Sequence, residues 1–154
     1  MIDFTLPTPC LTLDITLLDQ NIQRMQTEVN QAGKQLRPHV KTHKCPELAK
    51  RQIAAGAIGI CVTKVSEARV MAEQGIGNIL ITSPMVTASK LEQLALCHKG
   101  DPNLLVVCDS MDNATQLNTM AIYPLNVLVD IDPGVGRTGV AYDDALALGQ
   151  FIDQ

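Results

Sequence analysis

The chain has 154 residues, of which 46% are apolar, enough for one compact domain with a buried core. Twelve Lys and Arg residues against sixteen Asp and Glu residues give a formal charge of −4, which removes the electrostatic reason to expect nucleic acid or an anionic membrane as a partner. No run approaches the roughly 20 apolar residues that cross a bilayer, no leader is recognisable, and the cysteines are scattered. We therefore expect a cytoplasmic protein with reduced thiols and a small-molecule partner.

Short runs rich in β-branched residues alternate with helix-like stretches along the chain. Strands are predicted at residues 10–15, 36–41, 58–63, 78–82, 103–108 and 126–131. Helices are predicted at residues 16–32, 46–55, 66–74, 87–98, 111–121 and 143–152. The first helix has the clearest signals, because Thr16 can cap its start and Gly33 can end it, and Ser66 gives the same start signal further along. The short connections predict a parallel sheet with crossover helices, so the fold class is α/β.

Two architectures fit this alternation, a doubly wound sheet and a parallel (β/α)8 barrel of the TIM type. Side chains alternate across a strand, so Arg37, His39 and Lys41 are predicted on one face of the second strand. Three cationic or titratable groups on one face of a buried strand are costly unless they serve a site, and a barrel lumen provides such a place. We therefore expect an incomplete TIM-type barrel, since a complete one needs about 250 residues.

Lys41 lies at the carboxyl end of that strand, where parallel-sheet enzymes place their active sites. A lysine that forms an imine must be partly neutral near neutral pH, and nearby cations or burial lower its pKa toward that range. Arg37, His39 and Lys44 would supply such cations. An exposed basic loop without a site remains the alternative interpretation of the same run.

Three runs of the sequence resemble one known family. They are RPHVKTHK at residues 37–44, its continuation through residues 45–68, and VLVDIDPGVGRTGV at residues 127–140. The family is that of the pyridoxal 5'-phosphate (PLP)-dependent D-threonine aldolases and D-serine dehydratases, related to alanine racemase, and the likeness covers about residues 8–152. It implies a fold-type III enzyme, a PLP-binding (β/α)8 barrel followed by a mostly β C-terminal domain. Residues 1–154 would then be the N-terminal part of that barrel, with about five barrel strands, one N-terminal strand and no C-terminal β domain.

The resemblance also implies roles for individual residues. By position in these motifs, Lys41 is the catalytic lysine that forms the internal aldimine with PLP, and Arg137 lies near the phenolic oxygen of the cofactor. His39 and Thr63 are expected to bind the cofactor with them. The implied activity is that of a lyase in D-amino acid metabolism that acts on D-configured β-hydroxy amino acids, of the D-threonine aldolase or the D-serine dehydratase type. Complete members hold a divalent metal, Mn or Zn, on C-terminal residues absent here, and a homo-oligomer, a dimer, is implied.

Other interpretations stay open from the sequence. A non-catalytic PLP-binding protein and an inactive fragment are both alternatives to an enzyme. The run GVGRTG at residues 134–139 spells the dinucleotide fingerprint GxGxxG, but it lies too late in the chain for that motif. His39, His43 and Cys45 have the chemistry of metal ligands, yet no second pair accompanies them, so no metal site is predicted and His43 is expected to line the PLP site.

Two acidic residues follow the last predicted strand. Asp130 and Asp132 would either orient Arg37 or Arg137 by ion pairing or satisfy polar groups of the backbone, and we favour the structural role. An incomplete barrel also leaves strand edges and apolar surface uncovered, so we expect the isolated chain to self-associate.

Overall fold

The computed structural model describes residue 5 and residues 7–121 and 124–154. Four parallel strands form one sheet in the order β1-β2-β3-β4, namely β1 (Ile60–Val62), β2 (Ile79–Ile81), β3 (Leu105–Cys108) and β4 (Asn126–Val129). The helices are α1 (Ile15–Gln31), α2 (Pro46–Ala54), α3 (Val65–Glu73), α4 (Ala88–Gly100), α5 (Met111–Met120) and α6 (Ala145–Ile152), with short 3-10 turns η1 (Val40–Thr42) and η2 (Tyr142–Asp144). The sequential strand order, with no reversal, matches a barrel and not a doubly wound sheet.

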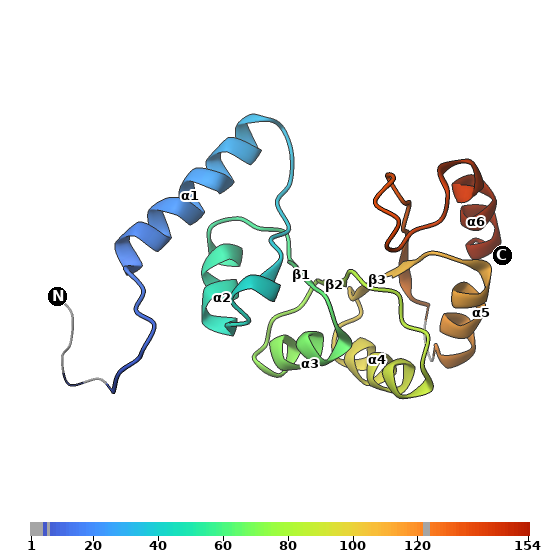
Figure 1. Ribbon diagram of the computed structural model, residues 1–154, viewed down its shortest axis with the longest axis horizontal. Helices are drawn as coiled ribbons and strands as arrows, with labels where there is room; N and C mark the ends of the chain where they lie inside the picture. The colour runs from blue at the N-terminus through green and yellow to red at the C-terminus, as the bar shows by residue number, and fades with distance from the viewer. Residues whose placement is uncertain (1–4, 6, 122–123) are drawn as a thin grey trace.

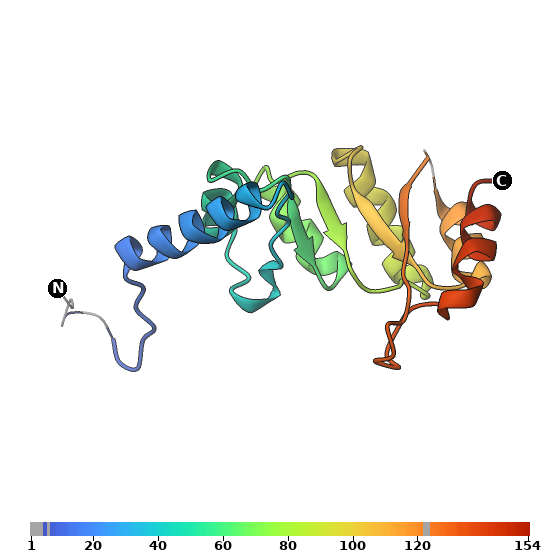
Figure 2. The same cartoon turned by 90° about the horizontal axis from the view of Figure 1, so that it is seen from above.

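The sheet has one face covered by helices and one open face. Helices α2 to α5 follow one side of the sheet in chain order, and α1 extends away from the body of the molecule (Figures 1 and 2). Ile60, Val62, Ile79 and Ile81 are completely buried against these helices, whereas the alternating side chains of β1 and β2 are only partly buried. In a (β/α)8 fold the face away from the helices is the barrel interior. The predicted α/β class and incomplete barrel are therefore confirmed.

The strand predicted at residues 10–15 is not formed. Residues 7–14 have no regular structure, Leu11 is fully exposed, and helix α1 already begins at Ile15. A strand needs a neighbouring backbone to accept and donate its hydrogen bonds, and no strand of residues 7–121 or 124–154 lies beside this segment. The cap of α1 is Asp14 and not Thr16, because the Asp14 carboxylate accepts the Leu17 amide at 3.0 Å.

The strand predicted at residues 36–41 is formed only in part. The segment runs beside β1, where the Cys61 amide donates to the Pro38 carbonyl at 2.7 Å and a single bridge joins His39 to Cys61. Pro38 has no amide hydrogen for a ladder, and the chain turns into η1 at Val40, so the pairing stops early. Where about five barrel strands are expected, the described part of the chain has four strands and this extended segment.

Gly59, just before β1, allows a close approach that a side chain would prevent. A Cβ atom there would collide with the Asn78 carbonyl and with the Arg37 guanidinium, which itself hydrogen-bonds to Asn78. We expect Gly59→Ala to lower the free energy of unfolding by about 1–3 kcal/mol, measured by urea denaturation. Gly149→Ala is the control, because a Cβ atom at this position of helix α6 would meet no other atom within 4 Å. This change should stabilise the chain by about 0.5–1 kcal/mol. Equal effects of both changes would contradict the packing seen at Gly59.

Candidate functional site

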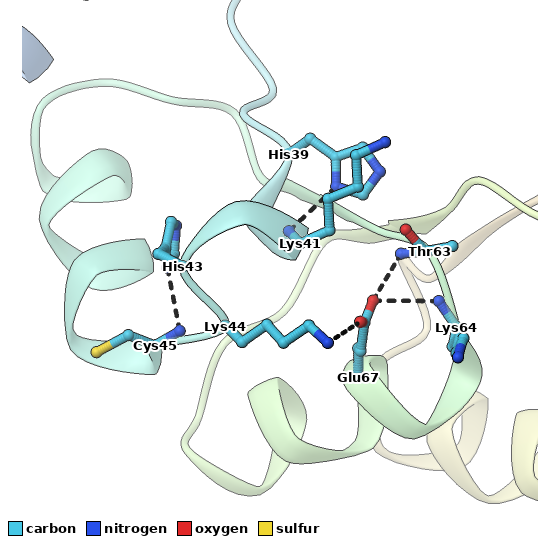
Figure 3. A network of polar contacts seen from close by, with 8 residues as sticks. All are labelled: His39, Lys41, His43, Lys44, Cys45, Thr63, Lys64 and Glu67. Atoms are coloured by element: carbon cyan, nitrogen blue, oxygen red, sulfur yellow. Dashed lines mark hydrogen bonds and ion pairs between the residues drawn. The ribbon is translucent and has the colours of Figure 1, made fainter.

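Lys41 lies in η1, directly beyond the segment that runs beside β1 and at the carboxyl edge of the sheet. Val40 is buried at 1% exposure and anchors the turn, while Lys41 is exposed. The Val40 carbonyl accepts the amides of His43 at 3.2 Å and Lys44 at 2.7 Å, which closes the turn. The backbone amide of Lys41 donates to Nδ1 of the His39 ring (Figure 3). Within the described residues, no carboxylate lies at ion-pair distance from Lys41, so its amine is available to a ligand.

Arg37 and His39 share the open face of the sheet, as predicted, but they lie at opposite ends of β2. Arg37 donates to Asn78, which precedes β2, with one Nη to Oδ1 distance of 3.0 Å. His39 Nε2 lies 3.3 Å from Thr82 Oγ1, just after β2. Lys41 does not continue the alternation, because η1 replaces strand geometry at that position. The prediction that all three share one strand face is therefore wrong for Lys41, and Arg37 lies at the amino edge, away from it.

The hydrogen bonds of His39 define its tautomer. The Lys41 amide donates to Nδ1 at 3.3 Å, so Nδ1 carries no proton. Thr82 Oγ1 donates its own hydrogen to the Val62 carbonyl at 3.0 Å, and it can therefore accept a hydrogen bond from His39 Nε2. His39 thus connects the backbone of Lys41 to the ends of β1 and β2 in its neutral, Nε2-protonated form.

The electrostatic surroundings favour the same form of His39. Burial, and next the Lys41 ammonium, lower the pKa of His39, and these outweigh Glu67 and the Cys61 backbone, which act in the opposite direction. A histidine with a lowered pKa is neutral near neutral pH, as its hydrogen bonds require. The ring is therefore suited to hold the turn and not to carry charge.

Thr63, which follows β1, belongs to a network centred on Glu67 (Figure 3). The Thr63 and Lys64 amides donate to Glu67 Oε2 at 2.9 and 3.3 Å, and the Lys44 ammonium lies 3.5 Å from Glu67 Oε1. Because Glu67 satisfies these amides, α3 begins at Val65, and the prediction of Ser66 as its cap is wrong. Sequence reasoning missed Glu67, although a glutamate in the first turn of a helix is a known capping signal.

His43 presents an unpaired buried nitrogen beside the same turn. Its Nδ1 accepts the Cys45 amide at 3.0 Å, so the proton of the neutral ring is on Nε2. Nε2 is buried and has no hydrogen-bond partner among the residues that the structure describes. Unpaired buried donors are rare in folded proteins, and a ligand acceptor would satisfy this one. Across residues 7–121 and 124–154, no three His, Cys, Asp or Glu side chains are grouped to hold a metal ion.

Arg137 is exposed on the loop that follows β4, and Asp132 organises this loop. The Asp132 carboxylate accepts the amides of Gly134, Val135 and Gly136 at 2.8 to 3.1 Å. The structural role favoured for Asp132 is confirmed. The same amides would have to bind phosphate in a dinucleotide site, but here a carboxylate occupies them, so the fingerprint interpretation of these glycines fails.

The Asp132 loop should depend on pH. The amide of Gly136, followed by those of Gly134 and Val135, holds the pKa of Asp132 below its ordinary value. A lowered pKa means that the carboxylate stabilises the loop at pH values above the ordinary aspartate pKa and loses this effect as the pH falls through the lower, folded value. We expect the Gly134 and Gly136 amide NMR signals to shift with a midpoint below that of an exposed aspartate. In Asp132→Asn this titration should be absent, and its persistence there would assign it to another group.

The structure therefore brings three of the four predicted cofactor residues together. His39 contacts the backbone of Lys41, and Thr63 joins through Glu67 and Lys44. Arg137 lies beyond β4, at the same edge of the sheet but at the far end of the strand order, and no described hydrogen bond or ion pair connects it to Lys41. The carboxyl edge thus offers a free amine, a neutral histidine and an unpaired donor on one side, and a cation on the other.

Known proteins are similar to this chain in sequence and in architecture. The chain matches the family model described as alanine racemase, N-terminal domain, over residues 13–154. It is 42% identical over 147 residues to D-threonine aldolase of Arthrobacter sp., covering 92% of this chain and 38% of that protein. It is 34% identical over 157 residues to D-threo-3-hydroxyaspartate dehydratase of Delftia sp. strain HT23, covering 96% of this chain and 40% of that protein.

A solved structure agrees with these matches. The crystal structure of D-threonine aldolase from Filomicrobium marinum superposes with a TM-score of 0.92 and 39% identity, covering 96% of this chain and 41% of that one. The chain thus spans about two fifths of the length of the proteins it resembles. None of the described helices is long and apolar enough to span a membrane.

Proposed function

The chain belongs to the alanine racemase N-terminal domain family, and from this we propose that it is the lysine-bearing part of a PLP-dependent lyase acting on D-configured β-hydroxy amino acids. The observation that carries the proposal is Lys41, an amine without a carboxylate partner in the described residues, held at the carboxyl edge by His39. Parallel barrels place catalytic groups at this edge. We propose Lys41 as the residue that binds PLP covalently.

The residues at this edge fit such a cofactor. The Lys41 amine suits its aldehyde, and the unpaired His43 Nε2 is a donor for one of its oxygens. Arg137 and Thr63 are proposed to bind it as well, Arg137 as a cation near the phenolic oxygen. When bound, PLP supplies an electron sink for the charge that develops when a bond at Cα of an amino acid breaks.

His39 is proposed to position Lys41 and not to transfer protons. Its Nδ1 is occupied by the Lys41 amide, and Nε2 is within hydrogen-bond distance of Thr82. A general base needs a free lone pair directed at the substrate proton, which this ring lacks in the present arrangement. A proton taken from or given to a substrate is therefore proposed to move through a group other than His39, with Lys41 as the candidate at this edge.

Two reactions are consistent with the substrate class. Cleavage of the Cα–Cβ bond of D-threonine gives glycine and acetaldehyde. Loss of the α-proton and the β-hydroxyl of D-serine as water gives an enamine, which water then hydrolyses to pyruvate and ammonia. We propose the aldolase type first, because identity is 42% with the aldolase and 34% with the dehydratase.

A divalent metal, Mn or Zn, is proposed to assist through residues beyond this chain. The cytoplasmic location and a homo-oligomeric state belong to the same proposal, and sedimentation tests the latter.

The test is a titration of the chain with PLP, followed by borohydride reduction and peptide mass analysis. We expect an absorbance band near the visible edge and a reduced cofactor on Lys41. Release of acetaldehyde from D-threonine or of pyruvate from D-serine, with added Mn or Zn, then identifies the reaction. Labelling without product would favour a non-catalytic PLP-binding protein. If Lys41 is not labelled, the proposal fails and an inactive fragment is the remaining interpretation.

A further inference from the structure

We propose that Glu67 is a positioning residue for Lys41, which it holds in place by binding Lys44 at the end of the turn that presents the reactive amine. This inference rests on the proposed role of Lys41. The Glu67 side chain lies between helix α3 and the turn, with one carboxylate oxygen directed at each (Figure 3). It does not contact the Lys41 amine, so it acts through the turn.

The turn needs support at its far end because its backbone is strained there. Lys44 has φ of 50°, in the left-handed region that residues with a Cβ rarely adopt. Such conformations persist only where surrounding contacts hold them, and they gather at functional sites. Three contacts act on this end of the turn: the Lys44 amide on the Val40 carbonyl at 2.7 Å, the Cys45 amide on His43 at 3.0 Å, and the ion pair of Lys44 with Glu67.

Glu67 is suited to this task because the protein backbone fixes its carboxylate. Its Oε2 accepts two amides at the start of α3, and its side chain is only 15% exposed, whereas that of Lys44 is 68% exposed. Burial alone would raise the pKa of Glu67, but the Thr63 and Lys64 amides and the Lys44 ammonium together hold it below the ordinary value. A fixed and ionised carboxylate is therefore presented to a flexible lysine.

The same carboxylate also caps α3, so the test must separate capping from positioning. Glu67→Gln keeps an oxygen that can accept the Thr63 and Lys64 amides but removes the charge that binds Lys44. Lys44→Gln removes the other partner and leaves the α3 cap intact. Glu73→Gln is the matched control, because Glu73 lies on the same helix and forms an exposed ion pair with Arg69 at 3.6 Å.

Two measurements are made on the wild-type chain, on the three single variants and on the double variant that combines Glu67→Gln with Lys44→Gln. Hydrogen exchange by NMR reports the Lys44 and Cys45 amides, with the Asp130 amide, bonded to the Cys108 carbonyl at 2.8 Å, as an internal reference. Borohydride trapping reports how fast PLP added to the solution becomes fixed on Lys41. We expect each single change to speed exchange of the two turn amides and to slow trapping by about two- to fivefold, as loss of a partly exposed ion pair allows.

The double variant should show the same exchange and trapping rates as either single variant, because Glu67→Gln and Lys44→Gln remove the same ion pair. Glu73→Gln and the Asp130 amide should be unaffected. Unchanged exchange at Lys44 and Cys45 in Glu67→Gln, or effects of the single changes that simply add, would overturn the proposal and leave Glu67 as a cap of α3 alone. If the wild-type chain does not trap PLP on Lys41 but the exchange pattern is as expected, the role of Glu67 in the turn stands and the cofactor proposal fails.

Discussion

Lys41→Ala is expected to abolish the trapping of PLP at the carboxyl edge and the accompanying absorbance band. The reason is that a covalent link to the cofactor needs a primary amine, and two other lysines near this turn are paired with carboxylates. Lys44 lies 3.5 Å from Glu67 and Lys50 lies 2.9 Å from Glu47. Lys41 is an exposed side chain on a short turn, so its loss should leave the unfolding midpoint almost unchanged.

The control for this experiment is Lys90→Ala, which removes an exposed lysine at the start of α4. This variant should trap PLP on Lys41 as fast as the wild-type chain. Trapping is measured by the mass of the peptide that carries the reduced cofactor, so that labelling of any other lysine is seen directly. A Lys41→Ala chain that still gives the band with wild-type intensity would show that another amine binds the cofactor.

The alternation of strands and helices could be predicted because both depend on short-range periodicity. Residues such as Ile79 and Ile81 alternate with less buried neighbours, and Gly33, at φ of 65°, ends α1 as expected. The predicted strand at residues 10–15 failed because a strand is defined by its partner, and β propensity says nothing about whether a partner lies beside it. The ends of the remaining strands differ by a few residues for the same reason, whereas helix ends depend on local caps such as Asp14 and Glu67.

The candidate site could be predicted only where its residues lie close in the sequence. His39 and Lys41 are two residues apart and do contact each other, although through η1 and not along a strand face. Glu67 was missed because its partner Lys44 lies on another segment. The turn that brings the two together has a left-handed conformation at Lys44, and the sequence gives no sign of it because the residue is not a glycine. Periodicity describes faces of single elements, whereas ion pairs between elements depend on their packing.

Ile81→Ala should produce the largest loss of stability among these changes. Ile81 is 0% exposed in β2 and belongs to the core between the sheet and its helices. Truncating a buried isoleucine removes its transfer free energy and leaves a cavity, so the free energy of unfolding should fall by about 2–5 kcal/mol in urea denaturation. Leu80→Ala is the matched control in the same strand, because its side chain lies on the open face and is only partly buried.

Leu80→Ala should lower the free energy of unfolding by less, about 1 kcal/mol, since a partly buried side chain gains less from burial than a completely buried one. The Ile81 change also tests whether the site depends on the stability of the core, because Thr82, the next residue, lies within hydrogen-bond distance of His39. At low temperature, where the Ile81→Ala chain stays folded, PLP should be trapped on Lys41 at the wild-type rate, because the core lies on the helix side of β2 and the site on the other. Equal losses of stability in the two variants would mean that both faces of the sheet are buried, which is incompatible with an open barrel interior.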